Sequence, residues 1–170
     1  MAKIADVETT SSEVTAIPVE KELAAQKILK KYAAIAVTAG FVPVPLLDIA
    51  TLAGIQVKAI QEIAHLHGQD LSDHKGKAAV STVITALSAN PVSKVGASLL
   101  KVVPVLGGAL SAVAFHGYAA ASTYALGSLF HQHFATGGTV LDFDATKAKD
   151  AYKKLVTKYK SKDETAPATA

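Results

Sequence analysis

Residues 41–58, FVPVPLLDIATLAGIQVK, decide the fold because two prolines divide an otherwise apolar run. Pro45 suits the first position of a helix, and Gly68 suits the position that follows a helix. The pattern predicts an apolar helix between these two residues. Its first turn carries one carboxylate, Asp48, where the helix dipole stabilises negative charge. Asp48 therefore either fixes the start of this helix or makes a polar contact at a subunit interface.

The composition is more apolar than that of an ordinary soluble domain. Half of the 170 residues are hydrophobic, and 18% are charged where about 25% is usual. All 17 basic residues are lysine, so the chain lacks the guanidinium fork that clamps phosphate, and it has no cysteine for disulfides or thiolate metal sites. A net charge of +3 favours weak attraction to an anionic membrane and is too small to indicate nucleic-acid binding.

Start and stop signals along the chain predict an all-α fold of five to six helices, in one domain over residues 17–160. Disordered tails are expected at residues 1–16 and 161–170. Ser72 or Asp73 suits the N-cap of the third helix and Asp144 that of the last, and the only candidate strand is the short segment 139–143. The predicted helices cover residues 18–41, 45–67, 73–88, 91–101, 104–135 and 145–160.

Two blocks of the chain are nearly free of charge. Residues 32–57 contain one charged residue, Asp48, and residues 102–130 contain none. The second block exceeds the ~20 residues that cross a bilayer, but its many small residues are also typical of tight helix–helix packing. Direct lipid contact and a water-soluble assembly with an apolar interior both fit this pattern. The side chains predicted to face lipid or a neighbouring subunit are Phe41, Leu46, Leu47, Ile49, Leu52, Ile55, Leu106, Leu110, Val113 and Phe115.

Polar candidates fall on two of the predicted helices. In the helix over 45–67, Asp48, Lys58 and Glu62 lie within one narrow stripe and are predicted to make polar contacts at an interface. The last helix is rich in lysine and amphipathic, which suits either an anionic membrane surface or an ordinary solvated face. Its candidates for contact with a membrane surface are Lys153, Lys154 and Lys158.

No pattern of catalytic or cofactor-binding residues stands out. His65 with His67 and His131 with His133 are spaced two residues apart, about 200° around a helix, so neither pair can hold one metal ion. The sequence has no phosphate-binding glycine loop and no nucleophile-and-base arrangement. We therefore expect a non-enzymatic protein with no catalytic residues, no cofactor and no metal.

Several segments together are similar to a known family. They are VPVPLLDIATLAGIQVKAIQEIAHLHG at 42–68, LKVVPVLGGALSA at 100–112, TYALG at 123–127 and GGTVLDFD at 137–144. In this order they resemble the YcjF-like domain of unknown function, often found beside Era-like GTPase modules, over residues 20–160. The resemblance implies a membrane-associated helical protein without an assigned activity. Stand-alone members of the PopA type further imply a ring-like homo-oligomer that traps membrane lipid.

These observations predict a membrane-associated protein that binds or encloses membrane lipid and self-assembles, with phospholipid as the bound ligand and no nucleic-acid partner. Two alternatives stay open: a soluble adaptor for an Era-like GTPase, and an integral pore. The polar N-terminal residues lack the basic and apolar regions of a signal peptide, so the sequence does not indicate which membrane or compartment is involved.

Overall fold

The computed structural model describes residues 17–38, 45–88 and 108–164, and these residues form five helices and no strand. This confirms the all-α prediction. The helix predicted over 91–101, Pro43 and Pro104 lie outside the described residues. Residues 139–143 form a turn rather than a strand. The helices are α1 (Val19–Thr38), α2 (Pro45–Leu66), α3 (His74–Ser88), α5 (Gly108–Ala135) and α6 (Ala145–Glu164).

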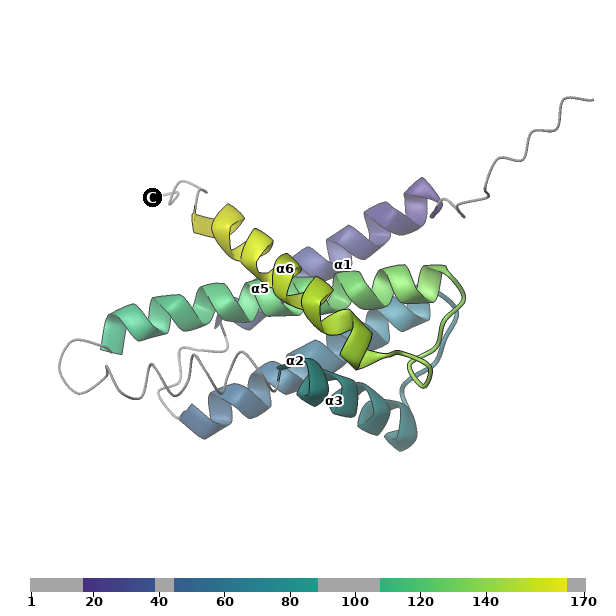
Figure 1. Ribbon diagram of the computed structural model, residues 1–170, viewed down its shortest axis with the longest axis horizontal. Helices are drawn as coiled ribbons and strands as arrows, with labels where there is room; N and C mark the ends of the chain where they lie inside the picture. Colours follow the sequence, from purple (N-terminus) through teal and green to yellow (C-terminus); the bar gives the residue numbers. More distant parts are fainter. Residues whose placement is uncertain (1–16, 39–44, 89–107, 165–170) are drawn as a thin grey trace, which may run out of the picture.

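The longest helix, α5, lies at the centre of the molecule (Figure 1). It packs against α1, α2 and α6, while α3 contacts α2 and α6. Its sequence contains no Asp, Glu, Lys or Arg. A helix without a charged face is stable in water when other helices cover it on most sides, which explains its central position.

The helix starts predicted at aspartates are confirmed. The Asp73 Oδ1 atom accepts a hydrogen bond from the Gly76 backbone N–H at 2.7 Å, so Asp73 caps α3. Asp144 Oδ1 accepts from the N–H groups of Thr146 and Lys147 at 3.0 and 3.1 Å and caps α6. These bonds satisfy donors that the first turn of a helix leaves without a partner.

Glycines end α2 and α5 as predicted, whereas α6 is longer than predicted. Gly68 and Gly137 have φ angles of 76° and 84°, the left-handed conformation that ends a helix. The last helix continues to Glu164, four residues beyond its predicted end at residue 160. The reason is local: residues 161–164, SKDE, contain neither proline nor glycine to stop the helix.

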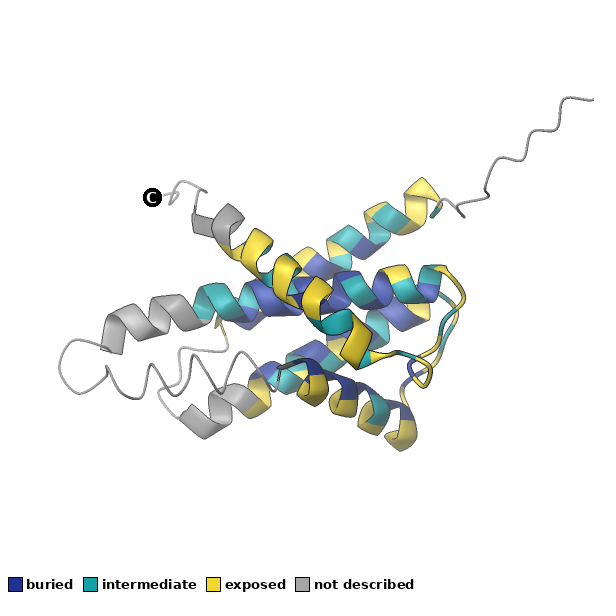
Figure 2. Ribbon diagram, in the orientation of Figure 1, coloured by how far each residue is buried: buried dark blue, intermediate teal, exposed yellow. Residues whose placement is uncertain are grey.

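The buried residues of the described helices form two clusters. Figure 2 shows buried positions along the central part of the bundle. The larger surrounds the second half of α5 and includes Phe130 and Tyr152, which are almost fully buried. The smaller joins Ala36 of α1, Leu52 of α2 and Ala119 of α5. The larger cluster closes the end of the bundle where α5 ends and α6 begins, and the smaller one lies toward the start of α5.

Close contact between α1 and α5 depends on Gly127. A methyl group at Gly127 would overlap the Leu29 side chain, which is buried, whereas one at Gly117 would meet no atom within 4 Å. Both glycines lie within α5, so alanine brings the same gain in helix propensity at each. We expect Gly127→Ala to be less stable than Gly117→Ala by about 1–3 kcal/mol, the usual effect of overpacking a core.

Chemical denaturation of the two variants, followed by circular dichroism, checks this expectation. Gly117→Ala should be at least as stable as the unmodified protein. Equal stability of the two variants would show that α1 and α5 are not packed as closely as described.

Candidate functional site

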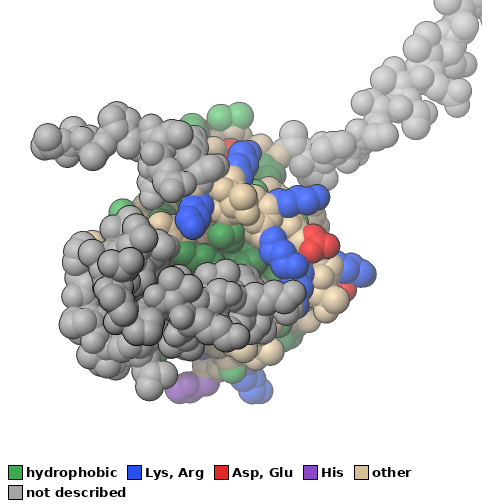
Figure 3. Space-filling model, turned by 60° about the vertical axis from the view of Figure 1, so that its left-hand side comes forward, with side chains coloured by type: hydrophobic (Ala, Val, Ile, Leu, Met, Phe, Trp, Pro, Cys, Tyr) green, Lys and Arg blue, Asp and Glu red, His purple; other side chains and the backbone are tan. Residues whose placement is uncertain are grey.

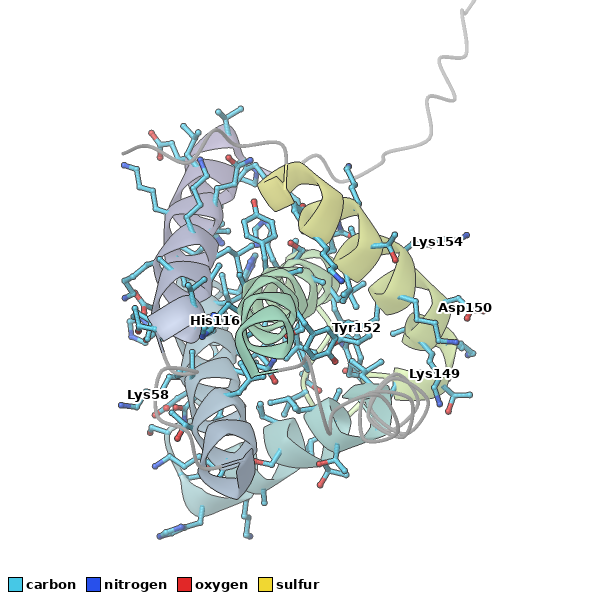
Figure 4. All side chains as sticks on the ribbon, turned by 90° about the vertical axis from the view of Figure 1, so that its left-hand side faces the viewer. Lys58, His116, Lys149, Asp150, Tyr152 and Lys154 are labelled. Atoms are coloured by element: carbon cyan, nitrogen blue, oxygen red, sulfur yellow. The ribbon has the colours of Figure 1, made fainter. Side chains whose placement is uncertain are left out.

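An open groove of about 410 Å³ runs between α1 and α5. Figure 4 shows α1 and α6 on opposite sides of α5, and Figure 1 shows that the two helices cross near the middle of α5 and diverge above it. The Tyr124 ring of α5 lies 4.1 Å, centroid to centroid, from the Tyr159 ring of α6, which places α6 beside the groove. The groove is lined by Lys30, Ala33, Ala34, Val37, Ala120 and Tyr124.

The groove is hollow because its walls are made of small residues. Three of its six lining residues are alanine, and of the six only Lys30 carries a charge. Val19 and Leu23 lie on the same flank of α1 as the groove residues Lys30 and Ala34. Successive members of this set are four, seven and four residues apart, and such spacings return to one face of a helix. Val19 is 73% exposed and Leu23 is 54% exposed, so two apolar side chains are accessible on this flank of α1, before Lys30.

The tyrosine in the groove is held in its neutral form. Burial, followed by the charge and hydrogen bond of Tyr159, raises the pKa of Tyr124 to about 12. The phenol is therefore uncharged at physiological pH. An apolar ligand in the groove would meet alanine, valine and a neutral phenol, with Lys30 among the lining residues.

The charged residues are unevenly distributed along the molecule. In the described residues, α1 has no charge after Lys31, α2 has none over 50–57, and α5 has none. Figure 3 shows lysine side chains bordering an apolar area on the face that the view brings forward. By contrast, the end of the molecule that contains the α2–α3 and α5–α6 connections carries four aspartates, Asp70, Asp73, Asp142 and Asp144. We call it the polar end.

The residues predicted to face lipid or a subunit are only partly placed. Phe41 and Leu106 lie outside the described residues. Leu52 is 7% exposed and packs in the smaller core cluster, with Ile55 beside it, so both contribute to the interior of this chain. The remaining candidates lie in α2 and α5 where side chains are not described: Leu46, Leu47, Asp48, Ile49, Leu110, Val113 and Phe115.

Of the predicted polar candidates on α2, Lys58 is exposed and Glu62 is engaged within the chain. The Lys31 ammonium of α1 donates to both carboxylate oxygens of Glu62, at 2.6 and 2.8 Å. This hydrogen bond raises the pKa of Lys31. Glu62 thus links α1 to α2, and Lys58 is the member of the predicted stripe that projects into solvent (Figure 4).

The predicted membrane-surface lysines lie on the outer side of α6. Lys153, Lys154 and Lys158 are all exposed. Lys153 lies 3.5 Å from the Asp150 carboxylate, an exposed pair of the kind that contributes little to stability. The structure therefore leaves the basic surface of α6 accessible.

A buried polar cluster at the polar end was not predicted. His131, which is 4% exposed, lies between Glu22 of α1 and His67, which directly follows α2, with both nitrogen contacts at 2.9 Å. The spacings of His65 with His67 and of His131 with His133 exclude a metal site within either pair. They give no sign that His67 of one pair contacts His131 of the other. That contact is set by the way α2 packs on α5.

The groove was also missed, although part of its signal was present. The small residues of α5, Ala120 among them, were recognised as packing positions. Which small residues are covered depends on the angle at which α1 and α6 cross α5, and a single sequence does not give that angle.

Among the described residues, none of the helices is both long enough and apolar enough to span a membrane. In the same part of the chain, no three metal-ligating side chains converge on one point.

Comparison with known proteins identifies a family. Residues 6–161 match the family model described as a domain of unknown function, DUF697. The chain is 33% identical over 157 residues to magnetosome membrane protein 22 of Magnetospirillum gryphiswaldense, a match that covers 89% of this chain and 78% of that protein. No solved structure matches the chain.

The raised pKa of Tyr124 leads to a pH-dependent stability. Between about pH 10 and about pH 12 the unfolded chain ionises this phenol while the folded chain does not, so the free energy of unfolding falls as the pH rises through this range. In Tyr124→Phe this contribution is absent, and the free energy should fall less steeply.

Unfolding in denaturant on the two sides of this range measures the effect. Tyr159→Phe is the matched control, because it leaves Tyr124 buried and should keep most of the fall. An equally steep fall in Tyr124→Phe would mean that the groove does not shield this phenol.

Proposed function

This chain belongs to the DUF697 family of domains of unknown function, and we propose that it is a non-enzymatic, membrane-associated protein that binds phospholipid and self-assembles. The family is consistent with the resemblance to YcjF-like domains. A ring of subunits enclosing lipid, as in members of the PopA type, is the finer form of the proposal. The proposal assigns no catalytic step and no cofactor to the chain.

The groove over α5 is the observation that carries the lipid-binding proposal. Its volume of about 410 Å³ lies within the range of small-molecule sites, and alanine and valine line most of it. A hydrocarbon chain in contact with these residues would remove apolar surface from water, which contributes about 25 cal/mol for each Å². Lys30 supplies a point charge of the kind that binds phosphate, so an acyl chain with an anionic headgroup suits both features.

Two further observations support membrane association. The relative at 33% identity is named a membrane protein. On the chain itself, the exposed lysines of α6 would be attracted to anionic lipid, at about 1 kcal/mol for each lysine near the surface. The groove and α6 lie beside one another, because Tyr124 contacts Tyr159. One orientation could therefore bring both features to a membrane.

Self-assembly is supported by apolar side chains that one copy leaves exposed on α1. Val19 and Leu23 lie on the groove flank, and Ile35, which is 41% exposed, lies on another flank. Neighbouring copies could cover both flanks, as a ring requires. An adaptor for an Era-like GTPase or an integral pore would need neither the groove nor Lys30, so the described residues support lipid binding best.

A charge placed in the groove tests lipid binding. In Ala34→Glu a carboxylate would face the acyl chain, and because a charge held against hydrocarbon costs about 2–3 kcal/mol, retained phospholipid should fall at least about tenfold. Ala86→Glu is the matched control, since it adds the same charge at an exposed alanine of α3, away from the groove.

Native mass spectrometry of both variants and the unmodified protein, with lipid extraction, gives subunit number and bound lipid together. We expect a discrete oligomer that carries phospholipid. A lipid-free monomer of the unmodified protein, or equal lipid in the two variants, would refute the proposal.

The basic surface of α6 gives a second test. Replacing Lys153 and Lys154 with alanine should weaken binding to anionic vesicles by about 2 kcal/mol at low salt, at about 1 kcal/mol for each lysine. Lys75→Ala with Lys77→Ala on α3 removes the same charge and should have a smaller effect. Vesicle co-sedimentation measures both, and equal weakening by the two pairs would show that net charge, not α6, governs attachment.

A further inference from the structure

Four polar side chains form one connected chain of hydrogen bonds across three helices. The Gln26 amide N–H donates to Glu22 Oε1 at 3.0 Å. Glu22 Oε2 lies 2.9 Å from His131 Nε2, and His131 Nδ1 lies 2.9 Å from His67 Nε2. The chain joins α1, α5 and α2 at the polar end of the molecule. Because His131 is 4% exposed, its ring cannot turn to water without disturbing the packing around it.

The position of each proton follows from the carboxylate. Hydrogen bonds from Gln26 and then His131 lower the pKa of Glu22, so at neutral pH this group is an ionised acceptor. His131 Nε2 must then carry a hydrogen and donate it to Glu22. In the neutral ring the other nitrogen, Nδ1, is an acceptor, and it accepts from His67 Nε2–H. Both histidines are therefore satisfied without a positive charge.

One additional proton can be accommodated without breaking the chain. If it resides on His131, Nδ1 becomes a donor to His67 Nε2, and His67 carries its hydrogen on the outer nitrogen. The charged His131 then forms an ion pair with Glu22. A second additional proton cannot be accommodated. His67 Nε2 and His131 Nδ1, which lie 2.9 Å apart, would then both carry a hydrogen, and both rings would be positively charged.

We propose that the hydrogen-bonded chain Glu22–His131–His67 is a pH-sensitive latch. When two additional protons bind to it, the α2–α3 corner, residues 62–71, separates from α5 while α1 remains attached. His67 is the ring that leaves, because it lies beyond the last residue of α2 and is less buried than His131. The bond between His131 and Glu22 becomes a full ion pair and holds α1. The proposal does not depend on lipid binding.

The surroundings of His67 all disfavour its charged form. Burial lowers the pKa of His67 most, followed by the charge of His131 from α5 and of Lys21 from α1; Glu22 of α1 lies beyond His131. The folded state therefore binds this proton less readily than the unfolded chain. It follows that the stability of the corner is present above the ordinary histidine pKa of about 6.5 and is lost as the pH falls from there toward the lowered value.

The corner has other attachments besides the histidine contact. The Gln69 side-chain amide donates to the Gly138 carbonyl at 2.6 Å, and the Gln61 amide donates to the Leu71 carbonyl at 2.5 Å. Ile63, Ala64 and Leu71 are buried in the larger core cluster. Loss of the histidine contact should therefore open the corner only locally, around His67, without unfolding α5.

Hydrogen exchange of the full chain at about pH 7.5 and about pH 5.5, corrected for the intrinsic pH dependence of exchange, tests the latch. Protection of residues 62–71 should fall by up to about tenfold for each pH unit below the ordinary histidine value, and protection of α1 around Glu22 should persist. In His67→Gln, whose amide can still donate to His131 Nδ1, this fall should be absent. His65→Gln, an exposed histidine at the same helix end, is the control and should behave as the unmodified protein.

The outcomes separate a latch from a merely structural contact. A structural role would lower protection in His67→Gln equally at both pH values and leave the pH dependence unchanged. That result, or an equal loss of protection in α1, overturns the proposal. If His67→Gln does not fold, NMR titration of the unmodified protein decides: the latch requires the pKa of His67 to lie below its ordinary value of about 6.5, and titration of His67 near about 6.5 would refute it.

Discussion

The structure depends on the need to cover one helix that has no polar side. α5 is 28 residues long and contains no acidic or basic residue apart from its histidines, so water is a poor environment for every face of it. Three helices, α1, α2 and α6, share the task of covering it, and each needs only one apolar face for its part. The charged residues of α1, α2 and α6 can therefore all point outward. The groove forms where α1 and α6 diverge and part of the α5 surface stays accessible.

Small residues in α5 have opposite effects according to what faces them. At Gly127 the absence of a side chain lets Leu29 approach the helix, and the result is dense packing between α1 and α5. At Ala120 the neighbouring residues of α1 are also small, and the result is a hollow. The same residue types thus produce tight contact in one turn of the helix and an open groove in another. The difference lies in the size of the partner side chain and the angle between the helices.

The positions of the helix ends could be predicted from the sequence, because each depends on a local interaction. Asp73 and Asp144 cap helices through backbone groups two or three residues away, and Gly68 and Gly137 end helices through their own φ angles. The error at the end of α6 has the same origin, since residues 161–164 contain no stop signal and the helix continues. The contact of His67 with His131 spans 64 residues and depends on how α2 packs on α5, which no local pattern encodes. The lining of the groove depends in the same way on the crossing of α1 and α5.

The start and the middle of α1 are held by different interactions, and this separates the groove from the proposed latch. Glu22 lies eight residues before Lys30, about 12 Å along the helix at 1.5 Å for each residue. It attaches the start of α1 to α5 through His131, while Lys31 and Glu62 attach the middle of α1 to α2. Protonation of His131 strengthens the first attachment and leaves the second unchanged. Acidification in the pH range of the proposed latch would therefore free the α2–α3 corner and keep the α1 wall of the groove in place. The contact that breaks is the one between His67 and His131. Glu22 of α1 is an acceptor and stays bonded to His131.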